Sequence, residues 1–144
     1  MITRRKVTMG LLIVPFLAGA GLATAPTPLA LDGYDPVAYF TDGAPRRGAE
    51  AHAVEWNGMR WHFASAESRA LFEADPTRFA PQFGGYCAWV VAQGYLAPID
   101  PTAWSIVDDR LYLNFNARIQ RRWERDIPGF IAAAQANWPG LQSN

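Results

Sequence analysis

Cys87 is the only cysteine among the 144 residues, and it lies in the run Gly84-Gly85-Tyr86-Cys87. A single cysteine cannot close a disulfide within its own chain. Four roles therefore remain open for Cys87: a small buried side chain, a metal ligand, a reactive thiol, or one half of a disulfide between two copies of the chain.

A metal site would have few soft ligands to draw on. Beside Cys87, the chain beyond residue 25 offers His52, His62 and Met59. A closed zinc site needs four ligands, whereas copper(I) is held by two or three soft ones. We expect Cys87 and His52 to form the metal-binding pair if their elements pack together, with copper as the first candidate and zinc as the second.

A reactive thiol is the second chemical possibility. Cys87 follows two glycines and is expected in the first turn of a short helix over 86–93, where free amides and the helix dipole favour a thiolate. The apolar neighbours Ala88 and Trp89 act against this, because burial raises the pKa of a thiol. A nucleophilic cysteine also needs a base, and the spacing of the two histidines does not identify one.

Asp35 is the carboxylate of most interest, because it stands between Tyr34 and Pro36. Aspartate before proline is typical of a turn, where its side chain accepts hydrogen bonds from nearby amides. We predict this capping role for Asp35. Together with Tyr34 and Tyr86 it is also a candidate polar site, although no second carboxylate stands close by in the sequence to complete an acid–base pair.

The first element that must position these residues is a β-hairpin over 52–63. Asn57-Gly58 is a preferred two-residue turn, and it predicts the pairs Trp56 with Met59 and His52 with Phe63. Alternation then places His52 and His62 on opposite faces unless a bulge intervenes. The face expected to meet the core carries Val54, Trp56, Met59, Trp61 and Phe63.

The remaining elements are a second hairpin and several short helices. The second hairpin is expected over 103–115 with its turn at Asp108-Asp109. Ser65 and Asn116 are typical helix caps, and Leu71 and Phe72 supply the apolar stripe of the helix after Ser65. The pattern predicts a single small α+β domain, two β-hairpins packed with short helices, without an internal repeat.

The first 25 residues are typical of an export signal. The basic run at 4–6 precedes an uncharged stretch rich in Leu, Ala and Gly. This predicts a signal peptide over 1–25, and Arg4-Arg5 is also compatible with a twin-arginine signal. We expect an extended leader over 26–31, a domain over 32–140, a periplasmic or secreted location, and no membrane span after cleavage.

Charge narrows the class of partner. Three of the 13 Lys and Arg residues lie in the signal region, and none of the 13 Asp and Glu residues do. The remaining chain is mildly acidic, which argues against a nucleic-acid partner. The classes of partner that remain are a small ligand, a metal ion and another protein.

Four segments together resemble the exported proteins of the YHS-domain family. They are GYDPVAYF at 33–40, WHFAS at 61–65 with the following Phe72 and Asp75-Pro76, PQFGGYCA at 81–88, and LYLN at 111–114. The resemblance implies a YHS-type domain, and the wider family is allied to small metal-binding cysteine domains. Those domains carry cysteines at the positions of Ala64 and Ser68, so this chain lacks the ligands from which metal binding would be inferred.

We therefore expect an exported, small, non-enzymatic binding domain of the YHS type. Its ligand would be a metal ion, copper first, or a protein partner. One alternative is a cysteine-dependent redox or hydrolytic enzyme that uses Cys87. Another is a structural or interaction module of the cell envelope.

Overall fold

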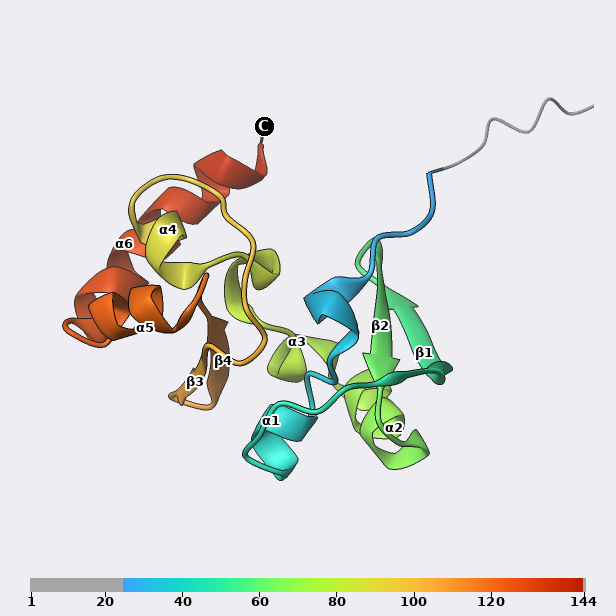
Figure 1. Ribbon diagram of the computed structural model, residues 1–144. Coiled ribbons are helices and arrows are strands. Elements are labelled where there is room, and N and C mark those ends of the chain that lie inside the picture. The colour runs from blue at the N-terminus through green and yellow to red at the C-terminus, as the bar shows by residue number, and fades with distance from the viewer. Residues whose placement is uncertain (1–24, 144) are drawn as a thin grey trace, which may run out of the picture.

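The computed structural model describes residues 25–143, so all but the last residue of the expected signal peptide lies outside the described part. These residues form one α+β domain, as the sequence predicts (Figure 1). In chain order its elements are η1 (Ala30–Gly33), α1 (Ala38–Thr41), β1 (Ala49–Trp56), β2 (Met59–Phe63), α2 (Ala66–Ala74), α3 (Pro76–Phe79), η2 (Gln82–Gly85), α4 (Ala88–Ala92), β3 (Trp104–Val107), β4 (Arg110–Leu113), α5 (Ala117–Trp123) and α6 (Ile127–Gln142). No described helix is both long and apolar enough to cross a membrane.

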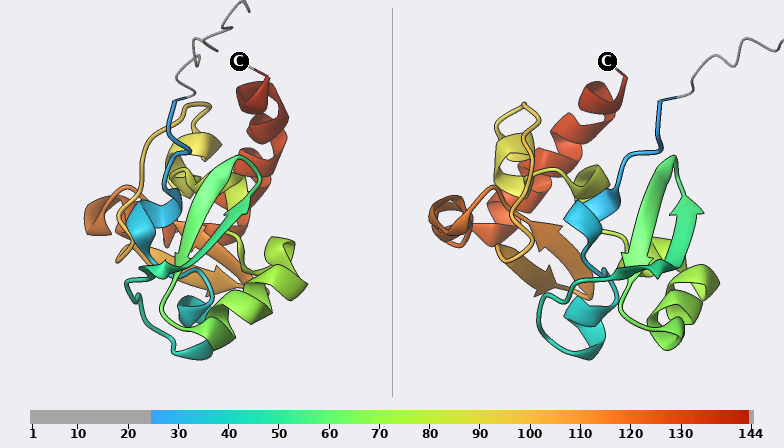
Figure 2. Two further views of the ribbon diagram at one scale, coloured as in Figure 1. Left: turned by 90° about the vertical axis from the view of Figure 1, so that its right-hand side faces the viewer. Right: turned by 45° about the vertical axis from the view of Figure 1, so that its right-hand side comes forward.

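The element order is an internal repeat, which the sequence analysis did not find. A short turn, a short helix, an antiparallel hairpin and two helices occur first over η1 to α3 and then again over η2 to α6. Figure 1 shows hairpin β1–β2 and α2 on one side and β3–β4 with α4, α5 and α6 on the other, and the right view of Figure 2 shows the same separation. The side chains of the two halves differ, so the repeat is recognised from the order of the backbone elements and not from the sequence.

The two opening turns have the same unusual backbone. Three consecutive residues have positive φ in each: Leu31, Asp32 and Gly33 in η1, and then 83–85 in η2. Each turn ends in a Gly-Tyr step, and the tyrosine N–H donates to the carbonyl three residues before it. Left-handed geometry costs a bulky residue such as Leu31 about 1–2 kcal/mol, so tertiary contacts must hold both turns in place.

The turn of the first hairpin is as predicted. Asn57 and Gly58 have φ values of 52° and 76°, and the register pairs Trp56 with Met59 and Val54 with Trp61. The expected face meets the core, because Trp61 and Phe63 are buried there and the other three apolar residues pack against them. On the opposite face the guanidinium of Arg60 lies 3.6 Å from the carboxylate of Glu55, as the register requires.

The predicted pairing of His52 with Phe63 is wrong. Phe63 pairs with Ala49, and the register shifts between Ala49 and Ala53, so that a bulge takes up residues 50–52, His52 among them. Gly48 is the physical reason, because it packs directly onto the backbone of the partner strand. A Cβ at Gly48 would lie only 2.6 Å from the carbonyl oxygen of His62, so the strand bends where no side chain intervenes.

Helix α2 begins as predicted but packs through one residue rather than two. The Ser65 hydroxyl accepts a hydrogen bond from the Ser68 amide at 3.1 Å, which caps the helix. Phe72 is fully buried, with its ring 5.1 Å from that of Trp61. Leu71 is 46% exposed, so its expected place in the apolar stripe is wrong: the helix approaches the hairpin along the Phe72 side.

Strand β4 joins the two halves. Leu111 and Leu113 face the first core with the hairpin residues, while Tyr112 between them faces the second core with Trp123 and Phe83. The hydroxyl of Tyr39 in α1 also crosses between the halves and donates to the carbonyl of Pro101 at 2.7 Å. The two repeats therefore have separate cores that meet on opposite faces of β4.

Candidate functional site

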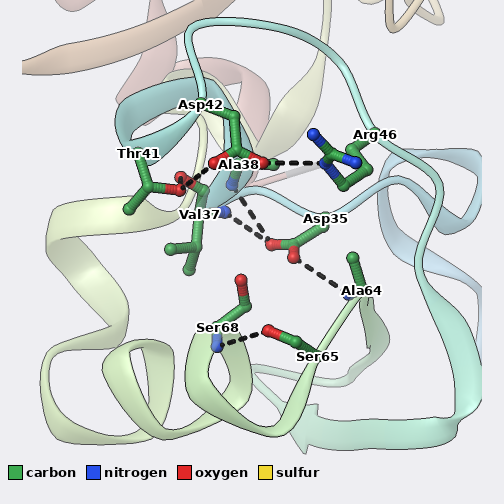
Figure 3. A network of polar contacts seen from close by, with 9 residues as sticks. All are labelled: Asp35, Val37, Ala38, Thr41, Asp42, Arg46, Ala64, Ser65 and Ser68. Carbon is green, nitrogen blue, oxygen red and sulfur yellow. Dashed lines mark hydrogen bonds and ion pairs between the residues drawn. The ribbon is translucent and has the colours of Figure 1, made fainter.

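Asp35 caps the chain where the first repeat enters α1. It is fully buried, and its carboxylate accepts hydrogen bonds from the amides of Val37 at 2.8 Å, Ala38 at 3.4 Å and Ala64 at 2.9 Å (Figure 3). The Ala64 bond ties the end of β2 to the start of α1. The predicted capping role is thereby confirmed, with a long-range partner that local sequence did not indicate.

Cys87 stands at the equivalent position of the second repeat. The backbone N–H of Asp35 donates to the Arg46 carbonyl at 2.8 Å, and that of Cys87 donates to the Ala97 carbonyl at 3.0 Å. As the Asp35 carboxylate accepts from the chain after β2, so the Cys87 sulfur accepts from the Phe115 amide at 3.2 Å, just after β4. Cys87 precedes α4 rather than lying in its first turn.

Asn114 completes this second cap, and the sequence analysis did not single it out. Its side-chain Oδ1 accepts from the Trp89 amide at 3.0 Å and lies 3.5 Å from the Cys87 sulfur, which can donate its S–H to it. Asn114 is fully buried, and its Nδ2 has no hydrogen-bond partner within the described residues. The sequence signal was a lone polar residue at the end of the apolar run 111–113.

The buried environment of Cys87 favours the neutral thiol over the thiolate. Burial raises the pKa of the Cys87 thiol, and the nearby amides of Val90, Phe115 and Trp89 lower it by a smaller amount. The side chain is fully buried and makes no disulfide. Its contacts therefore match the first role considered for it, a small buried side chain that holds a turn together.

We predict that native Cys87 is alkylated slowly. At pH 8, its reaction with iodoacetamide should be at least about 100-fold slower than in urea, because a buried thiol reacts only when the chain opens locally. The measurement is the mass increase of the intact protein with time. A native rate equal to the rate in urea would contradict this geometry and restore the reactive-thiol hypothesis.

The proposed metal ligands lie on different parts of the molecule. His52 is half-buried in the bulge of β1, whereas Cys87 is enclosed beside α4, and Figure 1 shows these elements on opposite sides. The bulge also removes the alternation argument that separated His52 from His62. Over residues 25–143, no group of three or more His, Cys, Asp or Glu side chains could hold a metal ion. Binding of copper or zinc through Cys87 and His52 stays a prediction.

The candidate polar residues are likewise distributed. The carboxylate oxygens of Asp35 are both used by amides, and Tyr34 lies beneath the guanidinium of Arg47, 5.0 Å from its ring centre. Tyr86 packs against Trp138 with ring centres 6.2 Å apart and remains partly exposed. Of the three, Tyr86 alone lines a cleft.

That cleft lies beside the two left-handed turns, between the two halves of the domain. It has a volume of about 220 Å³. Both left-handed turns contribute to it, since residues 30–32 and 84–85 line its wall. The remaining lining residues come from the leader, β2, the two residues that flank η2 and the loop after α4: Leu29, Met59, Trp61, Pro81, Tyr86, Pro98 and Ile99.

The cleft wall is mainly apolar with a few polar groups at its edge. Asp32 carries the one charged side chain of the lining, and Tyr86 presents its ring. An adjoining hollow of about 200 Å³ shares Met59, Trp61 and Gly84 and continues the surface toward Trp138 in α6. Such apolar recesses with a small number of polar groups are typical of small-ligand sites.

Comparisons of the chain with protein-family models, with characterised proteins and with solved structures found no match. The cleft and the two caps therefore rest on geometry alone. Leu31 and Phe83 have strained left-handed backbones in the two turns that line the cleft. Such strain is concentrated at functional sites in proteins, which makes the cleft a candidate site.

Proposed function

We propose that this protein is an exported, non-enzymatic binding domain of the YHS type, which takes a small and largely apolar ligand in the cleft between its two repeats. The observation that carries the proposal is the cleft itself. It is formed where the two strained turns, η1 and η2, approach each other, and residues of both turns line it.

The chemistry of the wall supports an apolar ligand. Met59 is unbranched and polarizable and adapts to irregular shapes, while Trp61 supplies a broad ring. The volume of about 220 Å³ is below the range of about 300–1,000 Å³ usual for ligand pockets, which favours a one- or two-ring molecule or a single side chain of a partner. Exposed Leu29 and Tyr86 at the cleft offer further apolar contact.

The position of Cys87 supports a binding role over cysteine chemistry. Its burial and raised pKa disfavour the thiolate that a nucleophile requires. Neither histidine is hydrogen-bonded to the sulfur, whose partners are Phe115 and Asn114. An envelope interaction module without a small ligand is the outcome that remains if the cleft proves empty.

We predict that the cleft binds prodan, a neutral probe built on a two-ring naphthalene, whose fluorescence rises and shifts to shorter wavelength in a dry site. The wild-type protein should bind one equivalent, and Tyr86→Ala should raise the Kd about tenfold, because a lost ring contact is worth roughly 1.4 kcal/mol. Fluorescence titration gives both the stoichiometry and the Kd.

Tyr95→Ala is the matched control. Tyr95 is 70% exposed and does not line the cleft, so its removal should leave the Kd unchanged. Equal weakening by Tyr86→Ala and Tyr95→Ala would show that the probe binds elsewhere. Absence of any fluorescence rise in the wild type would count against a small apolar ligand and in favour of an interaction module.

A further inference from the structure

Four arginines occupy one face of α5 and the residues that follow it. Arg118, Arg121, Arg122 and Arg125 follow the i, i+3, i+4, i+7 spacing, so they lie on one side of the helix. The opposite side is buried through Trp123. The four side chains line a shallow surface hollow to which no other residue contributes. We call them the α5 arginine face.

These arginines have no carboxylate partner within residues 25–143. The ion pairs of the described chain use Arg46, Arg60, Arg69 and Arg78, and none uses the α5 arginine face. The adjacent Asp126 is engaged instead as the cap of α6, where it accepts from the Gly129 amide at 3.1 Å. The guanidinium donors of the face make no hydrogen bonds to other described side chains or backbone.

One member of the face is held in place. The guanidinium of Arg122 stacks on the ring of Trp89 at 5.6 Å, and Trp89 in turn contacts Phe130 of α6. This cation–π contact restricts the Arg122 side chain, while its guanidinium N–H groups make no hydrogen bond within the described residues. A preorganised arginine loses less freedom when it binds an anion than a mobile one does.

The arrangement destabilises the helix on its own. Like charges three and four residues apart repel each other, and the face contains four such pairs. Glu124 and Asp126 stand at the same spacing from Arg121 and Arg122, but neither forms an ion pair with them in the described chain. Burial of Trp123 holds α5 in place without any contribution from these charges. The face is therefore an exposed cluster of positive charge that no described carboxylate neutralises.

We propose that the α5 arginine face binds a compact, multiply charged phosphate group, either free or on a lipid headgroup. Guanidinium forks match phosphate oxygens in pairs, and four of them can neutralise an anion of several charges. This site is separate from the cleft and from its apolar ligand. The compact hollow and the fixed Arg122 favour a phosphate group over an extended acidic peptide.

The test titrates inorganic pyrophosphate into the purified protein at low ionic strength by calorimetry. A parallel arm measures cosedimentation with vesicles that contain phosphatidic acid, whose phosphate monoester can carry more than one charge, and, as the neutral comparison, vesicles of phosphatidylcholine alone. The double variant Arg121→Gln/Arg125→Gln should raise the Kd about 25-fold, roughly fivefold for each arginine. Physiological salt should weaken binding in both arms, because exposed charges are screened.

Arg46→Gln/Arg69→Gln is the control, since it removes the same charge from arginines that are already ion-paired elsewhere. It should change the Kd less than twofold. The thermal midpoint of the α5 variant should equal or exceed that of the wild type, because repulsion is relieved.

Binding of pyrophosphate alone assigns a free anion, and binding of anionic vesicles alone assigns a headgroup. Both results support the face as a phosphate site. No binding in either arm, or equal weakening by the two double variants, overturns the proposal. Titration of the neutral cleft probe is unaffected by this result, so failure of one site is distinguishable from failure of the other.

Discussion

Replacement of Asp35 by alanine is expected to lower the free energy of unfolding by about 3–5 kcal/mol. The fully buried carboxylate accepts from three amides, and alanine would leave the N–H groups of Val37, Ala38 and Ala64 without their partner (Figure 3). Each unsatisfied buried donor costs about 1–3 kcal/mol. A loss of this size is a large part of the stability of an ordinary domain. Urea denaturation followed by tryptophan fluorescence measures it.

Two further variants separate this role from a general effect of charge removal. Asp42→Ala, at an exposed ion pair with Arg46, should cost less than about 1 kcal/mol. The loss of unfolding free energy for Asp35→Asn should fall between those for Asp35→Ala and Asp42→Ala. Its one remaining side-chain oxygen can still accept from the Val37 amide, while its NH₂ group faces the Ala64 amide, which is also a donor. If Asp35→Ala costs no more than Asp42→Ala, the cap does not hold β2 to α1.

Phe72→Ala is the second change for which a large effect is expected, about 3–5 kcal/mol of unfolding free energy. Phe72 is fully buried at the centre of an aromatic cluster, with ring-centre distances of 5.6 Å to Trp56, 5.1 Å to Trp61 and 5.0 Å to Phe63. Alanine would leave a cavity that three large rings cannot close by small movements. The shift of the urea midpoint is the measurement.

Leu71→Ala provides the control at the neighbouring position of the same helix. Leu71 is exposed, and alanine is a good helix former, so the change should stay within about 0.5 kcal/mol. An equal loss for Leu71→Ala and Phe72→Ala would mean that α2 packs on the hairpin through both residues, as its sequence pattern indicated.

The residues whose structural roles the sequence predicts correctly are those governed by turn conformation and capping, which act between near neighbours in the chain. Asn57-Gly58 requires positive φ at both positions, which determines the register for four pairs, and Ser65 and Asn116 cap the helices that follow them. Asp35 was identified as a capping residue because an aspartate at a turn can reach the amides two and three residues ahead. Each of these interactions spans a few residues of chain.

The candidate sites were predicted less well because their partners lie far along the chain. Cys87 was left with four possible roles until its sulfur was found beside Asn114 and the Phe115 amide. Cys87 and Asp35 occupy equivalent positions in the two repeats, but their side chains do not reveal this. A thiol in one repeat and a carboxylate in the other accept the corresponding hydrogen bonds. The cleft joins residues 29–32 to residues 98–99, and no periodicity connects such segments.

The sequence by itself determined the α+β class, the two hairpin turns, the helix caps and the core face of the first hairpin. These follow from backbone conformations and side-chain alternation, which act over a few neighbouring residues. Tertiary structure alone decided the bulge at His52, the choice of Phe72 over Leu71, the internal repeat and the enclosure of Cys87. Each depends on which surfaces meet when distant segments pack. Gly48 is one example, because it packs on the backbone of β2, where a side chain would overlap with other atoms.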